Sequence, residues 1–238
     1  MKVAIVGSAL STKDNAPFDD PSWEIWGMAW RSRDMPRVDR VFEMHAEEFW
    51  GDYASVELYS AWLGNPTPLG GSEKPPVVYV RPEDAKKYRK CKAYPLEAAI
   101  KLMGCEYFAS SFSYALAMAI NEGATEIAIY GVDLVADDEY AYQRPNAEYL
   151  LGIARGKGIK IHVPWQSALL KAQWVYGKET APRPDPMQAH FMKKLHDYEE
   201  KIEDLMAQMH TLSGAKQEAS EIVEAFKVKN RGALGGMT

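Results

Sequence analysis

Residues 111–130 read SFSYALAMAINEGATEIAIY, and this stretch decides the fold class. Its alanine-rich first part predicts a helix from Ser111 to Glu122, with Gly123 placed as a C-terminal cap. The run from Glu126 to Tyr130 predicts a buried strand, which Gly131 ends. A helix followed at once by a buried strand is the second half of a β-α-β unit, so the sheet is expected to be parallel.

The same alternation continues on both sides of this unit. Short apolar runs predict strands at Val3–Val6, Trp23–Gly27, Arg40–Met44, Val77–Val80 and Gly158–Val163. Helices are predicted over 46–63, Pro95–Met103, Pro145–Gly156 and Ser167–Trp174, and loops over 8–22 and 64–76. The fold class is therefore α/β, with a doubly wound, mostly parallel, Rossmann-like sheet of about five to seven strands.

The composition changes after this domain, which we assign to residues 1–178. Three prolines in Ala181–Pro186 predict a stiff linker over 179–186. Apolar residues then recur every three or four positions, at Met187, Phe191, Leu195, Tyr198, Ile202, Leu205, Met209 and Leu212. Such a seam is typical of a coiled coil, so residues 187–230 are expected to self-associate as a long helix, with an interruption of the seam at Gly214. A helix folded back on its own domain is the alternative.

Charge and composition exclude some classes of protein. The 238 residues carry a formal net charge of -5, which gives no support for binding to duplex nucleic acid. No apolar run approaches the roughly 18 residues of a membrane span, and the first one is too short for a signal peptide. We therefore expect a cytoplasmic protein. Cys91 and Cys105 lack metal-ligand spacing, so reduced thiols and no metal site are expected.

Ligands of an open parallel sheet bind beyond the carboxyl ends of its strands. Gly7 and Ser8 follow the first strand, and Ser110 and Ser111 precede the alanine-rich helix. Amide and hydroxyl groups in such places suit phosphate, although a serine before a helix also acts simply as its cap. The chain has neither a GxGxxG fingerprint nor a GxxxxGK[ST] loop, which disfavours dinucleotide and P-loop sites.

Other polar side chains follow the predicted strands. Asp133 suits a ribose hydroxyl, a metal ion or a turn cap, and Glu43 and His45 follow the third strand. A histidine in this position is a candidate general base or a packed, non-catalytic residue. Tyr140 and Arg144 belong to a polar and aromatic cluster that suits phosphate.

These motifs together resemble the bacterial lipooligosaccharide sialyltransferases, which use CMP-sialic acid on a Rossmann-like domain with a lid. The resemblance covers most of residues 1–176. It rests on the segments 5–11, 23–26, 110–111, 126–133, 139–142 and 163–170. The chain also resembles uncharacterised phage-encoded proteins with the same run of motifs, in which case it would act in the host cytoplasm.

The resemblance implies roles for individual residues. It assigns nucleotide and sugar contacts to Gly7, Ser8, Ser110 and Ser111, and a phosphate contact to Tyr140 of the lid. The chain departs from the family at three contact positions, which hold Ser8, Ala29 and Val135. It also has no histidine between His45 and His162, where the family carries a catalytic lid histidine.

Three functional hypotheses follow from these features. The first is a metal-independent glycosyltransferase-like enzyme that acts on a nucleotide-sugar, with His45, Glu43 or Asp133 as catalytic residues. The second is a nucleotide sensor or sponge that binds without catalysis, which the missing lid histidine favours. The third is a phage structural or assembly protein that oligomerises through its C-terminal helix.

Overall fold

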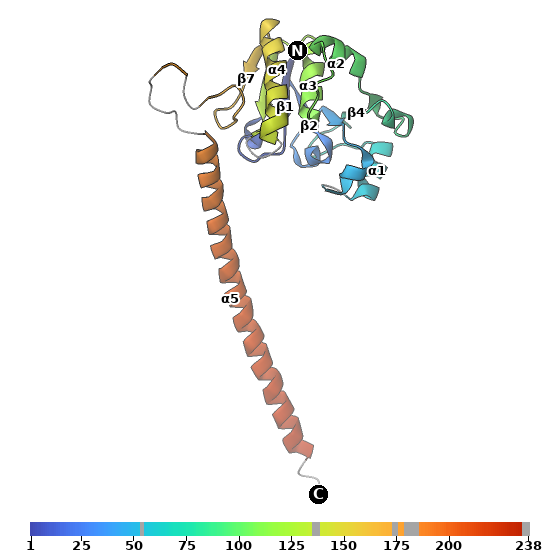
Figure 1. Cartoon of the computed structure of the whole chain (residues 1–238). Helices are drawn as coiled ribbons and strands as arrows, with labels where there is room; N and C mark the ends of the chain where they lie inside the picture. The colour runs from blue at the N-terminus through green and yellow to red at the C-terminus, as the bar shows by residue number, and fades with distance from the viewer. Residues whose placement is uncertain (53–54, 135–138, 173–175, 179–185, 235–238) are drawn as a thin grey trace. The chain divides into compact units, whose positions relative to one another are not determined.

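The structure is a computed structural model that describes residues 1–52, 55–134, 139–172, 176–178 and 186–234 (Figure 1). The chain divides into two units, Met1–Met187 and Gln188–Thr238. The first unit holds the sheet and its covering helices, and the second consists of most of one long helix. None of the helices in the described part of the chain is long and apolar enough to cross a membrane.

Within the described residues, seven strands form one parallel sheet in the order β5-β4-β3-β2-β1-β6-β7. They are β1 (Lys2–Val6), β2 (Trp23–Met28), β3 (Arg40–Glu43), β4 (Val77–Val80), β5 (Lys92–Ala93), β6 (Glu126–Tyr130) and β7 (Lys160–His162). The predicted α/β fold class is confirmed. The strand order reverses between β1 and β6, and Val6 lies opposite both Gly27 and Tyr130. Ligand crevices of open sheets form at such a reversal.

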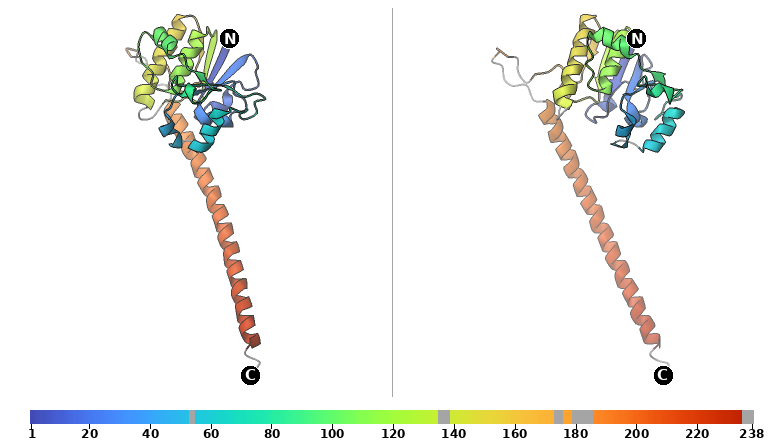
Figure 2. Two further views of the ribbon diagram at one scale, coloured as in Figure 1. Left: turned by 90° about the vertical axis from the view of Figure 1, so that its right-hand side faces the viewer. Right: turned by 45° about the vertical axis from the view of Figure 1, so that its right-hand side comes forward.

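Both faces of the sheet are covered, which explains the unbroken apolar runs of its central strands. One face packs on α2 (Leu96–Met103), α3 (Ser111–Asn121) and α4 (Arg144–Gly156), and Figure 2 shows these helices together on one side. Val3 and Ile5 of β1 point to this face. Ala4 and Val6 point to the other face, where the loop after β1 packs Ala16 and Phe18 against them.

Part of the second face is covered by a segment that differs from the prediction. The single helix expected over 46–63 is a 3₁₀ helix, Glu47–Asp52, followed by α1 (Val56–Gly64). Ser55 starts α1 as its N-cap, because its Oγ accepts a hydrogen bond from the Leu58 amide. Tyr59 of α1 and Trp50 are both buried against β3 and β4.

Two other expectations for this unit fail for physical reasons. The described part of Ser167–Trp174, residues 167–172, contains no helix. Leu170 has a φ of 58°, a left-handed conformation that does not continue a right-handed helix. Strand β5 was not predicted, because two exposed residues carry no hydrophobic pattern. It pairs with Tyr79 and Val80 of β4.

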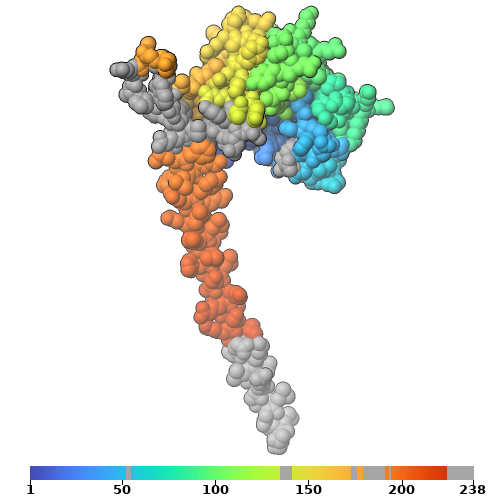
Figure 3. Space-filling view, viewed as in Figure 1, coloured from blue at the N-terminus to red at the C-terminus, as the bar shows by residue number. Residues whose placement is uncertain are grey.

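The second unit consists of most of α5 (Pro186–Leu234), 49 residues that extend over about 73 Å at the helical rise (Figure 3). The helix continues through Gly214, where the apolar seam was expected to be interrupted. A glycine inside a helix costs only about 1 kcal/mol relative to alanine, which 49 residues of regular helix tolerate. Residues 179–185 of the predicted linker lie outside the described residues.

Candidate functional site

Two glycines meet where the strand order reverses. The Gly7 amide donates to the Tyr130 carbonyl at 2.8 Å, and the Ala9 amide donates to the Gly131 carbonyl at 2.9 Å. A Cβ atom on Gly7 would lie 2.3 Å from the Gly131 carbonyl oxygen, closer than real Cβ contacts. Gly7 therefore lets the ends of β1 and β6 approach, and its amide is bonded within the fold.

Side chains of the loop after β1 tie it to the end of β6. Ser11 Oγ donates to Asp133 Oδ1 at 2.6 Å, and Thr12 Oγ1 accepts from the Gly131 amide at 2.8 Å. Asp133 is buried, and its carbonyl accepts from the Ala168 amide. The Asp133 carboxylate is thus held by the fold at the reversal point. Ser8, one residue past Gly7, is exposed.

Polar side chains surround the N-terminus of α3 and hydrogen-bond to one another and to the backbone. Ser110 caps the helix, because its Oγ accepts from the Ser113 amide at 3.4 Å. Asn146 of α4 is fully buried, and its Oδ1 accepts from the Ala109 amide and from Ser113 Oγ. Its Nδ2 donates to the Tyr107 carbonyl at 2.6 Å. These bonds hold the segment that leads into α3 in one conformation.

Ser111 differs from its neighbours at this helix end. The residue is 7% exposed, and its Oγ has no hydrogen-bond partner among the described residues. A buried hydroxyl without a partner costs about 1–3 kcal/mol, so such groups call for an explanation. A helix N-terminus adds unpaired amides and a partial positive charge, which together favour an anion.

A second polar group lies at the end of β3. Glu43 is 1% exposed and accepts from the His45 amide at 2.8 Å and from Tyr59 OH at 2.7 Å. His45 Nδ1 lies 2.7 Å from Glu43 Oε1, and the histidine side chain is 44% exposed. With the carboxylate as acceptor, Nδ1 carries the proton and Nε2 is the basic nitrogen.

The electrostatic environment of His45 follows from this geometry. The hydrogen bond to Glu43 raises the pKa of His45 above its ordinary value of 6.5, and burial opposes the shift only in part. The buried carboxylate thus orients the ring and increases its basicity. This arrangement suits proton transfer at a half-exposed nitrogen.

Arg144 begins α4 at the same edge of the sheet. Its Nε donates to Glu148 Oε1 at 2.9 Å, and its Nη2 donates to the Lys171 carbonyl at 2.8 Å. Glu148 Oε1 also accepts from the Leu170 amide. These bonds connect α4 to the loop after β7. The Tyr140 side chain, expected to contact phosphate, lies outside the described residues.

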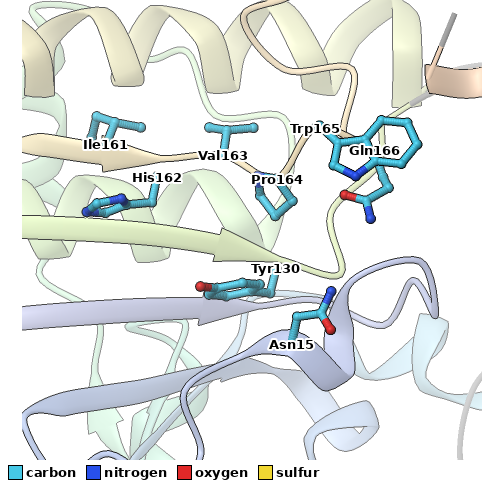
Figure 4. Close-up of a pocket in the computed structure, with 8 residues that line it drawn as sticks. All are labelled: Asn15, Tyr130, Ile161, His162, Val163, Pro164, Trp165 and Gln166. Carbon is cyan, nitrogen blue, oxygen red and sulfur yellow. The ribbon is translucent and has the colours of Figure 1, made fainter. Parts of the chain in front are cut away.

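A pocket of about 560 Å³ opens beside the ends of β6 and β7 (Figure 4). Its lining residues are Asn15, Tyr130, Ile161, His162, Val163, Pro164, Trp165 and Gln166. The loop that carries Trp165 is anchored by Ser167, whose Oγ donates to the Val132 carbonyl at 2.8 Å. Trp165 itself is 60% exposed, so a fixed loop presents an open aromatic surface.

The pocket was not predicted from the sequence. The available signal was the position of Trp165, which directly follows the last strand and Pro164. Asn15, which lies over 100 residues earlier, gave no such signal, because only the tertiary fold brings it to the pocket.

The structure groups the predicted residues into several clusters. Gly7, Ser11 and Asp133 meet at the reversal point, whereas Glu43 and His45 form their own group at the end of β3. Strands β3 and β6 are three positions apart in the sheet, roughly 14 Å at the usual interstrand spacing. All of these groups lie at the carboxyl edge of the sheet.

The chain was compared with solved structures, curated sequences and family models. Several solved structures that this chain is similar to are sialyltransferases. CstII from Campylobacter jejuni with a substrate analogue is 15% identical at a TM-score of 0.46, over 68% of this chain and 79% of that one. CST-II with a trisaccharide acceptor and CMP is 14% identical at a TM-score of 0.46, over 78% and 94% of the two chains.

An alpha-2,3-sialyltransferase from Campylobacter jejuni is 11% identical at a TM-score of 0.46, over 82% of this chain and 94% of that one. No protein-family model and no curated protein sequence matches the chain. Since these TM-scores are below 0.5, the residues of this chain, rather than its neighbours, carry the functional proposal.

Proposed function

We propose that the α/β unit binds a nucleotide or nucleotide-sugar at the carboxyl edge of its sheet and acts as a metal-independent glycosyltransferase. The observation that carries the proposal is Ser111, a buried hydroxyl without a described partner at the N-terminus of α3. A phosphate oxygen is a strong acceptor for this hydroxyl and for the unpaired amides of the first helical turn.

The remaining polar residues of the edge complete the proposed nucleotide site. Asp133 accepts hydrogen bonds from the ribose hydroxyls. A carboxylate is an acceptor-only group, and this one lies at the point where the strand order reverses. Ser8 contacts the phosphates from the loop after β1. Arg144 and Tyr140 neutralise and bind the leaving phosphate, an electrostatic role that grows as negative charge develops.

His45 is the proposed general base. Glu43 orients its ring through Nδ1, so that Nε2 accepts the proton of the attacking acceptor hydroxyl. Tyr59 donates to the second carboxylate oxygen and holds Glu43 in place. Glu43 is then a positioning residue, because its oxygens are engaged by His45 and Tyr59.

The sugar part of the ligand extends into the pocket beside Trp165. The amides of Asn15 and Gln166 both donate and accept hydrogen bonds, as sugar hydroxyls do. Trp165→Ala is expected to weaken binding of a nucleotide-sugar and to leave binding of the free nucleotide unchanged. Titration of the two ligands by calorimetry separates these effects, and equal losses for both would place the sugar elsewhere.

A thermal-shift screen against CMP, UMP, AMP, GMP and their sugar conjugates tests the binding proposal. A ligand at 100 times its Kd stabilises the fold by about 2.7 kcal/mol, which raises the Tm. Ser111→Ala should abolish the shift, yet raise the Tm of the free protein, because the unsatisfied hydroxyl is gone. Ser22→Ala, which lies just before β2 at the amino edge of the sheet, is the control. Tyr140→Phe tests the expected phosphate contact of Tyr140. No shift with any nucleotide contradicts the proposal.

Turnover decides between the enzyme and a non-catalytic sensor or sponge. His45→Asn should keep the thermal shift but reduce transfer or hydrolysis of the conjugate by about 10²–10⁴-fold, the usual contribution of a general base. Binding without turnover in the unmodified chain would instead support the sensor.

We also propose that the chain self-associates through α5. The hypothesis of a structural or assembly protein, whether or not it is phage-encoded, requires such self-association. The supporting observation is the exposure of its apolar seam, which between Leu195 and Leu212 runs from 52% at Ile202 to 71% at Leu212. Truncation after Lys178 should give a monomer in sedimentation experiments that still binds nucleotide. A truncated chain that remains oligomeric would contradict this proposal.

A further inference from the structure

The apolar seam of α5 fits one heptad frame from Phe191 to Leu212, whereas Met187, Met192, Met206 and Ile222 fall at the flanking e and g positions. With Leu195 at position a, the a positions are Leu195, Ile202, Met209, Lys216 and Val223, and the d positions are Tyr198, Leu205, Leu212, Ala219 and Phe226. Six consecutive layers, from Leu195 to Leu212, hold only large apolar or aromatic residues. A period of 3.5 residues predicts a left-handed pair of helices.

Two side-chain contacts within α5 lie on the side of the helix opposite the apolar seam. His196 pairs with Glu200 at 3.5 Å, and Gln217 Nε2 donates to Glu221 Oε1 at 3.1 Å. All four residues occupy the outer b and f positions. From 195 to 223, the b, c and f positions hold no large apolar residue. The helix therefore has one apolar face and one solvated face.

Charges next to the seam decide the orientation of a second copy. Positions e and g flank the seam, and in a parallel pair each g residue faces the e residue five positions later in the partner. Lys194 at g then faces Glu199 at e, once on each side of the pair. In an antiparallel pairing of the same six layers, e positions face e positions, so Lys201 at g lies against its own copy and Glu199 finds no basic residue at e among 192–220.

The layer residues also indicate the number of strands. A β-branched residue at a followed by leucine at d, as in Ile202 and Leu205, favours two strands. A single lysine at an a position, here Lys216, fixes the register at some cost in stability. We propose that two chains pair through α5 as a parallel, in-register, two-stranded coiled coil, an inference that rests on the proposed self-association.

Parallel pairing has a consequence for ligand binding. Both helices begin at Pro186 and at the same end of the pair, so two α/β units are tethered together there. An acceptor that presents repeated sites then meets two binding units at a high effective concentration. The advantage of the paired helix is therefore avidity rather than a new contact at the site.

Sedimentation of the full chain tests self-association and strand number first. The expected mass is twice the 26.7 kDa of one chain. A monomer overturns self-association itself, and a trimer or tetramer overturns the two-stranded pairing. Leu205→Asp should give monomers, whereas Glu203→Lys, at an outer b position, should leave the mass unchanged.

Engineered disulfides test the orientation separately. Cys105 is exposed and is first replaced by serine, whereas Cys91 is buried, and its burial raises the pKa of that thiol to about 11. In a parallel pair, Leu212→Cys alone should cross-link to itself on oxidation. A mixture of Leu195→Cys and Leu212→Cys chains should give no mixed dimer. The reverse pattern, a mixed dimer without self-cross-linking, overturns the parallel orientation.

A charge exchange tests the contact between Lys194 and Glu199. Lys194→Glu should raise the dimer Kd about tenfold, because two attractive pairs become two repulsive ones. Adding Glu199→Lys should restore the original Kd. The single change Lys201→Glu, which faces Met206 in the parallel pair, is the matched control. Equal effects of Lys194→Glu and Lys201→Glu would overturn the proposed register.

Discussion

At the scale of single residues, His45 connects the geometry of the site to a measurable pH dependence. Its imidazole contacts a carboxylate that is 1% exposed, and Tyr59 holds the other oxygen of that carboxylate. The charged form of His45 is therefore favoured in the folded state. The consequence for stability has a definite sign, since the pKa of His45 is raised on folding.

We expect the unmodified chain to gain more stability over His45→Asn at low pH than at high pH. The gain is fully present below the ordinary pKa of 6.5 and disappears as the pH rises through the raised pKa of the folded state. Chemical unfolding of both proteins between pH 5.5 and 9 measures the difference. A difference that grows with pH would show that the neutral ring is the form that the fold stabilises.

Gly7 is the residue on which the shape of the crevice depends most directly. We expect Gly7→Ala to destabilise the protein by about 1–3 kcal/mol, because the new Cβ meets backbone that has little room to move. Gly152→Ala is the matched control. A Cβ there meets nothing within 4 Å, so this change inside α4 should stabilise by about 0.5–1 kcal/mol. Denaturant unfolding of both variants measures these values, and a neutral Gly7→Ala would disprove the close approach.

At the scale of elements, α3 and α4 are joined by one buried amide. Asn146 of α4 bonds the Ala109 amide, Ser113 and the Tyr107 carbonyl, all of which belong to the start of α3 or to the segment before it. The proposed phosphate site thus depends on a side chain from the neighbouring helix. Packing between the two helices sets the conformation of the helix end.

Asn146→Ala should destabilise the fold by about 2–4 kcal/mol, because the buried Ser113 hydroxyl and the part-buried Ala109 amide and Tyr107 carbonyl lose their common partner. We also expect it to weaken nucleotide binding without touching the ligand, because the first turn of α3 loses its support. Gln143→Ala, one turn earlier and half-buried, serves as the comparison. Unfolding and ligand titration of the two variants give both numbers. Unchanged affinity in Asn146→Ala would mean that the helix end keeps its shape unaided.

At the scale of the whole molecule, the two units have different sources of stability. The α/β unit has its own cores on both faces of the sheet. In contrast, an isolated helix is marginal in water and gains its stability from packing of its apolar face. The apolar side chains of α5 from Leu195 to Leu212 are each more than half exposed within one chain.

Heating the full chain should therefore give two transitions with different concentration dependence. The transition of α5 should move to higher temperature as the protein concentration rises, because association stabilises it by mass action. The transition of the α/β unit should stay in place. Circular dichroism at two concentrations measures both, with the chain truncated after Lys178 as the single-transition reference. One cooperative transition in the full chain would indicate that the units unfold together.

The sequence by itself determined the central strands and most helices, the parallel sheet and the long C-terminal helix, but not β5 or the absence of a helix over 167–172. These follow from local patterns, because a buried strand needs a continuous apolar run and a paired helix needs a seam every three or four residues. The carboxyl-edge positions of Ser111, Asp133 and His45 followed as well, since each residue comes directly after a strand or before a helix.

Only the tertiary structure decided which of these residues meet. The bond between Ser11 and Asp133 joins residues 122 positions apart, and the pocket brings Asn15 beside Trp165. It also decided that Gly7 serves close packing and that Ser111 is buried without a described partner. Hydrogen bonds and burial depend on distances across the fold, whereas a periodic pattern records only which face of its own element each side chain occupies.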